Sequence, residues 1–180
     1  MKIKQIGIIF FVLLLSCNSA SKRQDNNYFK FSESLKTIDY GTRTSAQEFK
    51  TEACNKLVVL INADCSLCYS EIWQWEKLVR KHEFLQKVPL AFIIYGETFK
   101  PNLRLMKGSG MLRLTFLRDS LSSTLKGNSL ERDKFFNSFL LDKNNRIVIR
   151  GNPTLSEKVL HNYILYFSEK DHMRIDSIIH

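Results

Sequence analysis

The residues best suited to chemistry are Cys65 and Cys68, which are separated by Ser66 and Leu67. They follow an apolar run at residues 57–61 and open a stretch in which apolar residues recur at helical spacing. A helix N-terminus carries partial positive charge and unpaired N–H groups, which favour a thiolate. The thiolate is the nucleophile in disulfide exchange. The motif therefore predicts a redox dithiol, with Cys65 as the attacking thiol and Cys68 as the resolving thiol.

The N-terminus predicts export. Lys2 and Lys4 precede an apolar stretch at residues 6–15, which is too short to span a bilayer as a permanent helix. It has the character of a secretory signal peptide. The residues before Cys17 resemble a bacterial lipobox, which implies cleavage after residue 16 and lipidation of the Cys17 sulfur. An ordinary signal peptide with a chance cysteine is the alternative.

Composition and length limit the classes of protein to which the chain can belong. Loss of residues 1–16 removes Lys2 and Lys4, so the formal charge falls from +9 to about +7 over about 164 residues. That length suits one domain with a sizeable core, and the apolar and aromatic content excludes disorder for most of the chain. The positive charge is spread out, so we expect no nucleic-acid partner.

The remaining cysteine, Cys54, has two interpretations. It is a small, partly buried residue before a strand, or it is a third thiol that exchanges with Cys65 and Cys68. The sequence has no second C-x-x-C and no paired Cys and His, which argues against structural zinc, and we predict no metal site.

The rest of the pattern predicts alternating strands and helices. A Ser/Thr-x-x-Glu capping pattern at residues 44–49 favours a short helix. An Asn-rich turn between two apolar runs predicts a β-hairpin. The expected elements are a strand at 57–62, a helix at 65–82, a strand at 90–95, a loop at 97–110, a strand at 111–117, a hairpin at 138–150, and a final helix capped by Thr154 or Ser156.

Residues 57–78 and 139–153 together resemble the thioredoxin-like superfamily, near the lipid-anchored TlpA/ResA type. The resemblance implies an α/β fold in a single domain, with a central mixed β-sheet flanked by helices. It also implies thiol–disulfide oxidoreduction without an organic cofactor. The expected organisation is a signal peptide at 1–16, an anchor and tether at 17–44, the thioredoxin-like domain at 45–168 and a tail at 169–180.

Three positions depart from the family pattern. Asp64 stands where the family usually has Trp, and a carboxylate beside Cys65 is expected to raise the pKa of that thiol. The usual cis-proline, which shapes the substrate groove, falls near Phe136 and Asn137, where this chain has no proline. The strand before the motif lacks the buried carboxylate found in some thioredoxins, and Glu71 or Glu76 is the candidate replacement.

Two functions follow. The first is a thiol–disulfide oxidoreductase in a bacterial cell envelope, lipid-anchored and facing the periplasm or the exterior, with protein disulfides, dithiols or a redox partner as substrates. The second is a non-catalytic thioredoxin-like module that binds a partner and keeps Cys65–Cys68 as a structural disulfide. The first is the leading interpretation, and the missing proline and Asp64 are the features that count toward the second.

Overall fold

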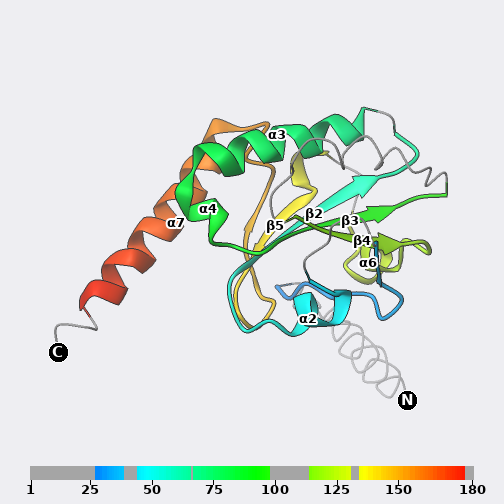
Figure 1. Cartoon of the computed structure of the whole chain (residues 1–180), viewed down its shortest axis with the longest axis horizontal. Coiled ribbons are helices and arrows are strands. Elements are labelled where there is room, and N and C mark those ends of the chain that lie inside the picture. Colours follow the sequence, from blue (N-terminus) through cyan, green and yellow to red (C-terminus); the bar gives the residue numbers. More distant parts are fainter. Residues whose placement is uncertain (1–26, 39–43, 66, 98–113, 131–133, 177–180) are drawn as a thin grey trace, which may run out of the picture.

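A mixed six-stranded sheet forms the centre of the computed structural model, in the order β1-β4-β3-β2-β5-β6 (Figure 1). β2, β3 and β4 are parallel, and β1, β5 and β6 run antiparallel to their neighbours. The predicted mixed sheet in a single domain is confirmed. The strands are β1 (Lys36–Thr37), β2 (Lys56–Asn62), β3 (Leu90–Tyr95), β4 (Leu114–Asp119), β5 (Ser138–Leu141) and β6 (Ile147–Arg150). The structure describes residues 27–38, 44–65, 67–97, 114–130 and 134–176.

The three parallel strands are buried on both faces, which explains their almost continuous apolar sequences. In register, Leu57 lies opposite Leu90 and Asn62 lies opposite Tyr95. The strands predicted at 57–62 and 90–95 are therefore confirmed. β4 begins at Leu114 in the described part of the chain, and the loop expected at 97–110 falls almost entirely outside it.

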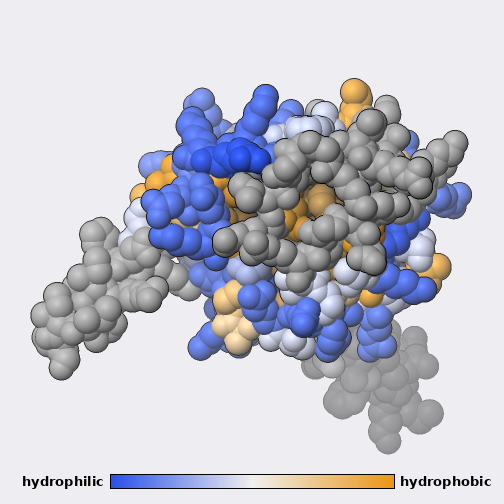
Figure 2. All heavy atoms as spheres, in the orientation of Figure 1, coloured by the Kyte–Doolittle hydropathy of each residue, from blue (hydrophilic) through white to orange (hydrophobic). Residues whose placement is uncertain are grey.

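Helices cover both faces of this sheet (Figure 1). They are α2 (Ala46–Thr51), α3 (Cys68–Lys81), α4 (Glu83–Gln86), α6 (Ser123–Gly127) and α7 (Glu157–Asp176), with a 3₁₀ turn, η1 (Lys134–Phe136). On one face, Ile72 and Trp75 of α3 and Tyr163 of α7 pack onto the side chains of Leu57, Val59 and Ile61. Hydrophilic side chains gather on the outer side of α3 and α4 (Figure 2).

The opposite face is covered by α2, α6 and an N-terminal strap, which we define as residues 27–38. The backbone N–H of Ile147 in β6 donates to Asn27 (2.6 Å), while Lys36 and Thr37 pair with β4 at the other edge of the sheet. The side chains of Phe29 and Leu35 are buried between these two points. The fold thus begins before the boundary predicted at residue 45. The sequence does not mark the strap, because the strap is held by long-range burial and has no periodic pattern of its own.

Local turn and cap signals are confirmed. Ser45 caps α2, its Oγ accepts from the N–H of Glu48 (3.2 Å), and the Glu48 carboxylate accepts from the N–H of Ser45 (2.7 Å). In the β5–β6 hairpin, Asn145 has φ 63°, the left-handed conformation that Asn tolerates. Ser156 precedes α7 and accepts from the N–H of Val159 (3.4 Å). α7 continues to Asp176, beyond the boundary predicted at residue 168.

Candidate redox site

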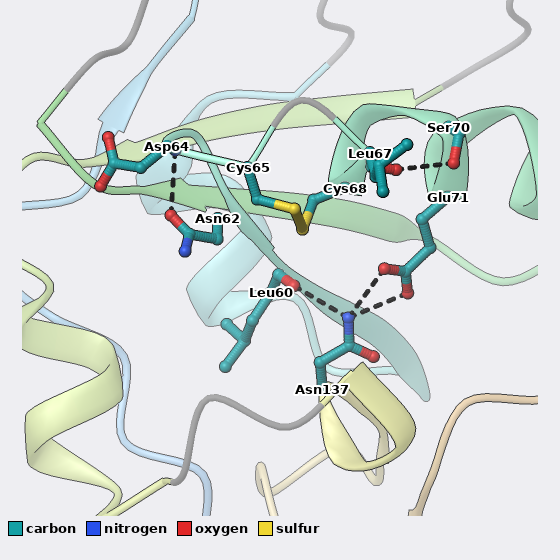
Figure 3. The surroundings of a disulfide bond; sticks show 9 residues. All are labelled: Leu60, Asn62, Asp64, Cys65, Leu67, Cys68, Ser70, Glu71 and Asn137. Atoms are coloured by element: carbon teal, nitrogen blue, oxygen red, sulfur yellow. Dashed lines mark hydrogen bonds between the residues drawn. A yellow bond between two sulfur atoms is a disulfide. The ribbon is translucent and has the colours of Figure 1, made fainter.

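Cys65 and Cys68 form a disulfide where β2 passes into α3 (Figure 3). Their Cα atoms are 5.3 Å apart, within the range of about 4.4–6.8 Å that disulfides require. Leu67, between them, is 79% exposed, whereas Cys68 packs against the core beneath α3. Both cysteines are half-buried, and Cys68 packs against the core. The roles of attacking and resolving thiol remain predictions.

The helix begins later than predicted. α3 starts at Cys68, whereas the sequence pattern placed its start at Cys65. Two successive turns precede it, because the N–H of Cys65 donates to Asn62 O (3.3 Å) and the N–H of Cys68 donates to Cys65 O (3.1 Å). Cys68 is thus the first helical residue, and Cys65 lies in the turn before the helix N-terminus.

A buried carboxylate lies one turn along α3 from Cys68. Glu71 is 7% exposed, and its two oxygens accept from Nδ2 of Asn137 at 2.9 and 3.0 Å (Figure 3). Nδ2 of Asn152 also donates to Glu71 Oε1. Glu76, the other candidate, instead pairs with Arg80 (2.7 Å). Of the two predicted replacements for the missing carboxylate, Glu71 is the one that lies one helical turn from Cys68, with its carboxylate directed toward Asn137 (Figure 3).

Asn152 is a site residue that the sequence did not single out. In the sequence, residues 151–153 predict only a break between two elements. In the structure, Asn152 is 1% exposed, and its side chain joins the loop before α7 to Glu71. Its Oδ1 accepts from the Thr154 hydroxyl (2.7 Å) and the Thr154 N–H (3.0 Å). An Asn after a glycine is common in turns, so no local signal separates this role from a turn.

Phe136 and Asn137, the two residues predicted for the substrate groove, lie in different environments. Asn137 lies beside the site: its backbone O accepts from the N–H of Leu60 (2.8 Å), and its side chain reaches Leu60 O (3.0 Å) as well as Glu71. Phe136 is half exposed, and the guanidinium carbon of Arg150 lies 5.5 Å from the centre of its ring. Asn137 thus places an amide beside the site, next to the exposed ring of Phe136, and the assignment of these two residues to a substrate groove stays a prediction.

Asp64 is exposed, and its carboxylate points away from both sulfurs (Figure 3). Its Oδ2 accepts from the backbone N–H of Glu97, at the end of β3 (3.2 Å). The predicted effect of Asp64 on the pKa of Cys65 stays a prediction, and the orientation favours a smaller effect than adjacency in sequence suggests.

Tyr69 lies next to the dithiol with its hydroxyl buried, and no hydrogen-bond partner is seen for that oxygen among the described residues. Burial raises the pKa of Tyr69; Arg118 opposes this shift, and the negative charge of Asp64 adds to it. The phenol therefore stays protonated at neutral pH.

Cys54 lies at the opposite end of β2 from the dithiol. The strand between them, Lys56–Asn62, is about 20 Å long at about 3.3 Å per residue. This separation excludes direct exchange between Cys54 and the pair within one molecule, so that hypothesis was wrong. Burial raises the pKa of Cys54, and the neighbouring Glu52 raises it further.

The described residues contain no cluster of three or more His, Cys, Asp or Glu side chains placed to hold a metal ion. They also contain no helix that is long and apolar enough to cross a membrane. Cys17 and the predicted signal peptide lie outside the described residues.

No protein-family model matches the chain, and no curated protein matches it. Solved structures do. A domain of a possible thiol-disulfide isomerase from Cytophaga hutchinsonii aligns with a TM-score of 0.55 at 15% identity, covering 81% of this chain and 96% of that chain. Yeast Sco1 aligns with a TM-score of 0.50 at 16% identity, covering 76% of this chain and 91% of that chain. At these identities the likeness shows the fold alone, and it confirms the thioredoxin-like fold.

Proposed function

We propose that this protein is a thiol–disulfide oxidoreductase that acts on protein disulfides or dithiols through Cys65 and Cys68. The observation that carries the proposal is the disulfide itself. It closes where a buried strand meets a helix, in a thioredoxin-like fold, with the carboxylate of Glu71 buried one helical turn from Cys68. No organic cofactor is needed for this chemistry.

In the reducing direction, the Cys65 thiolate attacks one sulfur of the substrate disulfide and forms a mixed disulfide, while the other substrate sulfur leaves as a thiolate. The Cys68 thiolate then attacks Cys65 Sγ and releases the second substrate thiol. The substrate gains two electrons, and Cys65–Cys68 becomes a disulfide that an external dithiol must reduce again. The oxidising direction reverses these steps.

We propose further that the protein works in a bacterial cell envelope, attached to the membrane through a lipid on Cys17. The support is the basic start, the short apolar stretch and the lipobox-like sequence before Cys17. Intact mass after bacterial expression should show loss of residues 1–16 and lipid on Cys17. Cys17→Ser should move the protein to the soluble fraction, and an unlipidated, soluble wild type would contradict the anchor.

The function is tested by trapping. Cys68→Ser leaves Cys65 able to attack but unable to resolve, so this variant should accumulate mixed disulfides with envelope proteins. Cys65→Ser, the matched control, should not. Cys54→Ser in both backgrounds removes adducts that the third thiol forms with other proteins.

The alternative is the binding module with a structural disulfide, favoured by Asn137 in place of proline. It predicts no Cys65-dependent adduct and no disulfide reductase activity when a chemical reductant is supplied. It also predicts a very negative reduction potential for the pair.

A further inference from the structure

The turn that leads into Cys65 is fastened to the end of β3. The N–H of Ala63 donates to Tyr95 O (2.7 Å), which continues the pairing of the two strands. The N–H of Asp64 donates to Oδ1 of Asn62 (3.0 Å), which closes the turn on itself. The Asp64 carboxylate then accepts from the N–H of Glu97 (3.2 Å). The residue before the first cysteine thus bonds to a segment 33 positions later in the chain.

Gly96 is shaped to receive this carboxylate. It has φ +113°, a conformation that side chains rarely adopt. A Cβ atom at Gly96 would lie 2.6 Å from Asp64 Oδ2 and 2.9 Å from Asp64 Cγ, so the carboxylate occupies the space of the missing side chain. The guanidinium of Arg118, in β4, donates to Gly96 O, so a second contact holds the backbone at Gly96 in place.

We propose that Asp64 is a positioning residue for the dithiol: its carboxylate holds the turn before Cys65 against Gly96 and Glu97, and so keeps Cys65 within bonding distance of Cys68. This role rests on the proposed function, because it matters for a pair that opens and closes. The turn restricts the conformations of the reduced pair to those near closure, which favours disulfide formation.

Substitutions can show whether Asp64 acts through its negative charge or by holding the turn in place. If Asp64 acts through its negative charge, replacement by neutral Asn has the full effect of removing the side chain. If Asp64 acts by position, Asn keeps an oxygen for the N–H of Glu97 and retains most of the function, whereas Ala loses it. Gly96→Ala should act like Asp64→Ala, because the new methyl group displaces the carboxylate.

The test uses the full chain with Cys17→Ser and Cys54→Ser in every variant, so that two thiols remain. The equilibrium constant for closing Cys65–Cys68 is measured in glutathione and dithiothreitol buffers, and exchange of the Glu97 amide is followed by NMR. Asp64→Ala and Gly96→Ala should each lower that constant about five- to tenfold, the effect of one ordinary hydrogen bond at an exposed site. A tenfold fall is about 30 mV for this two-electron couple.

Three further results are expected. Asp64→Asn should stay within about twofold of the parent. The double variant should resemble Gly96→Ala, since both contain the backbone strain at φ +113° and the contact with Asp64 is lost only once. Glu97 amide exchange should be faster in Asp64→Ala. Gly127→Ala, in which the added Cβ meets no atom within 4 Å, is the control for a general effect of glycine replacement.

The proposal is overturned if Asp64→Asn shifts the constant as much as Asp64→Ala, because the charge alone then matters. It is also overturned if Glu97 exchange is unchanged or if the two single effects add. A parent pair that no buffer reduces defeats both the proposed function and the positioning role. Fast Glu97 exchange in Asp64→Ala would then show that the contact exists but serves a static disulfide.

Discussion

At the scale of single residues, the environment of the free cysteine Cys54 can be measured through the reactivity of its thiol. Cys54 is partly buried beside Glu52, and both burial and that charge raise the pKa of its thiol. A raised pKa leaves less thiolate at a given pH, so the folded state favours the protonated thiol. Stability from this preference is complete below the pKa of the unfolded thiol and is lost as the pH rises through the folded pKa.

We therefore expect Cys54 to alkylate slowly near neutral pH. In a Cys65→Ser/Cys68→Ser variant, iodoacetamide should modify Cys54 several-fold more slowly in the folded protein than in urea, and the difference should narrow as the pH rises above about 9. Mass spectrometry of timed samples gives both rates. Equal rates at neutral pH would show that the thiol is neither shielded nor shifted.

Glu71 offers a second prediction at this scale. Glu71→Leu removes the carboxylate that accepts from the side-chain amides of Asn137 and buried Asn152, which then keep only Leu60 O and Asn137 Oδ1 as acceptors. The free energy of unfolding should fall by about 2–3 kcal/mol, as measured by urea denaturation. Glu71→Gln keeps one oxygen acceptor and should cost less. Glu83→Leu, at an exposed site on the neighbouring helix, should change little. A small effect in Glu71→Leu would mean that water replaces the carboxylate.

At the scale of elements, Gly151 sets the path from β6 to α7. It has φ +141°, and a Cβ atom there would lie 3.0 Å from a methyl carbon of Val159. Gly151→Ala should therefore lower the free energy of unfolding by about 1–3 kcal/mol. Gly127→Ala, at the end of α6, has open space around the added atom and should cause no loss. Similar stabilities for the two variants in thermal unfolding would show that the β6–α7 connection relaxes easily.

The sequence predicts an element when the residues that mark it lie close together in the chain. β2 and β3 are continuous apolar runs, the capping box at Ser45 lies within a few residues, and the hairpin turn is marked by Asn145. β1 is two residues long, and its pairing with β4 depends on contacts distant in sequence. The bond from Asp64 to Glu97 and the burial of Asn152 are of the same kind, since each joins segments that only the fold brings together.

At the scale of the whole molecule, the strap crosses the sheet from β6 to β4, and its own residues Lys36 and Thr37 form the edge strand β1. Phe29 is 3% exposed, and its ring lies against Phe31 and Phe139, with centroids 4.9 and 5.2 Å away. Phe29→Ala should lower the free energy of unfolding by about 3–5 kcal/mol, measured with urea. Tyr28→Ala, at the half-exposed neighbouring side chain, should change it by less than about 0.5 kcal/mol. Equal effects would mean that the strap is dispensable to the core.

The strap places the start of the described chain at the end of the sheet opposite the dithiol. Asn27 bonds to Ile147 at the end of the sheet where β2 begins, and the dithiol follows the other end of β2, about 20 Å farther on. If Cys17 is held at a lipid surface, residues 18–26 can span at most about 32 Å between the lipid and the end of the sheet where β2 begins. The dithiol then lies at the end of the sheet farther from the point of attachment. Such an orientation suits soluble proteins arriving from the surrounding compartment better than cysteines buried among lipid tails.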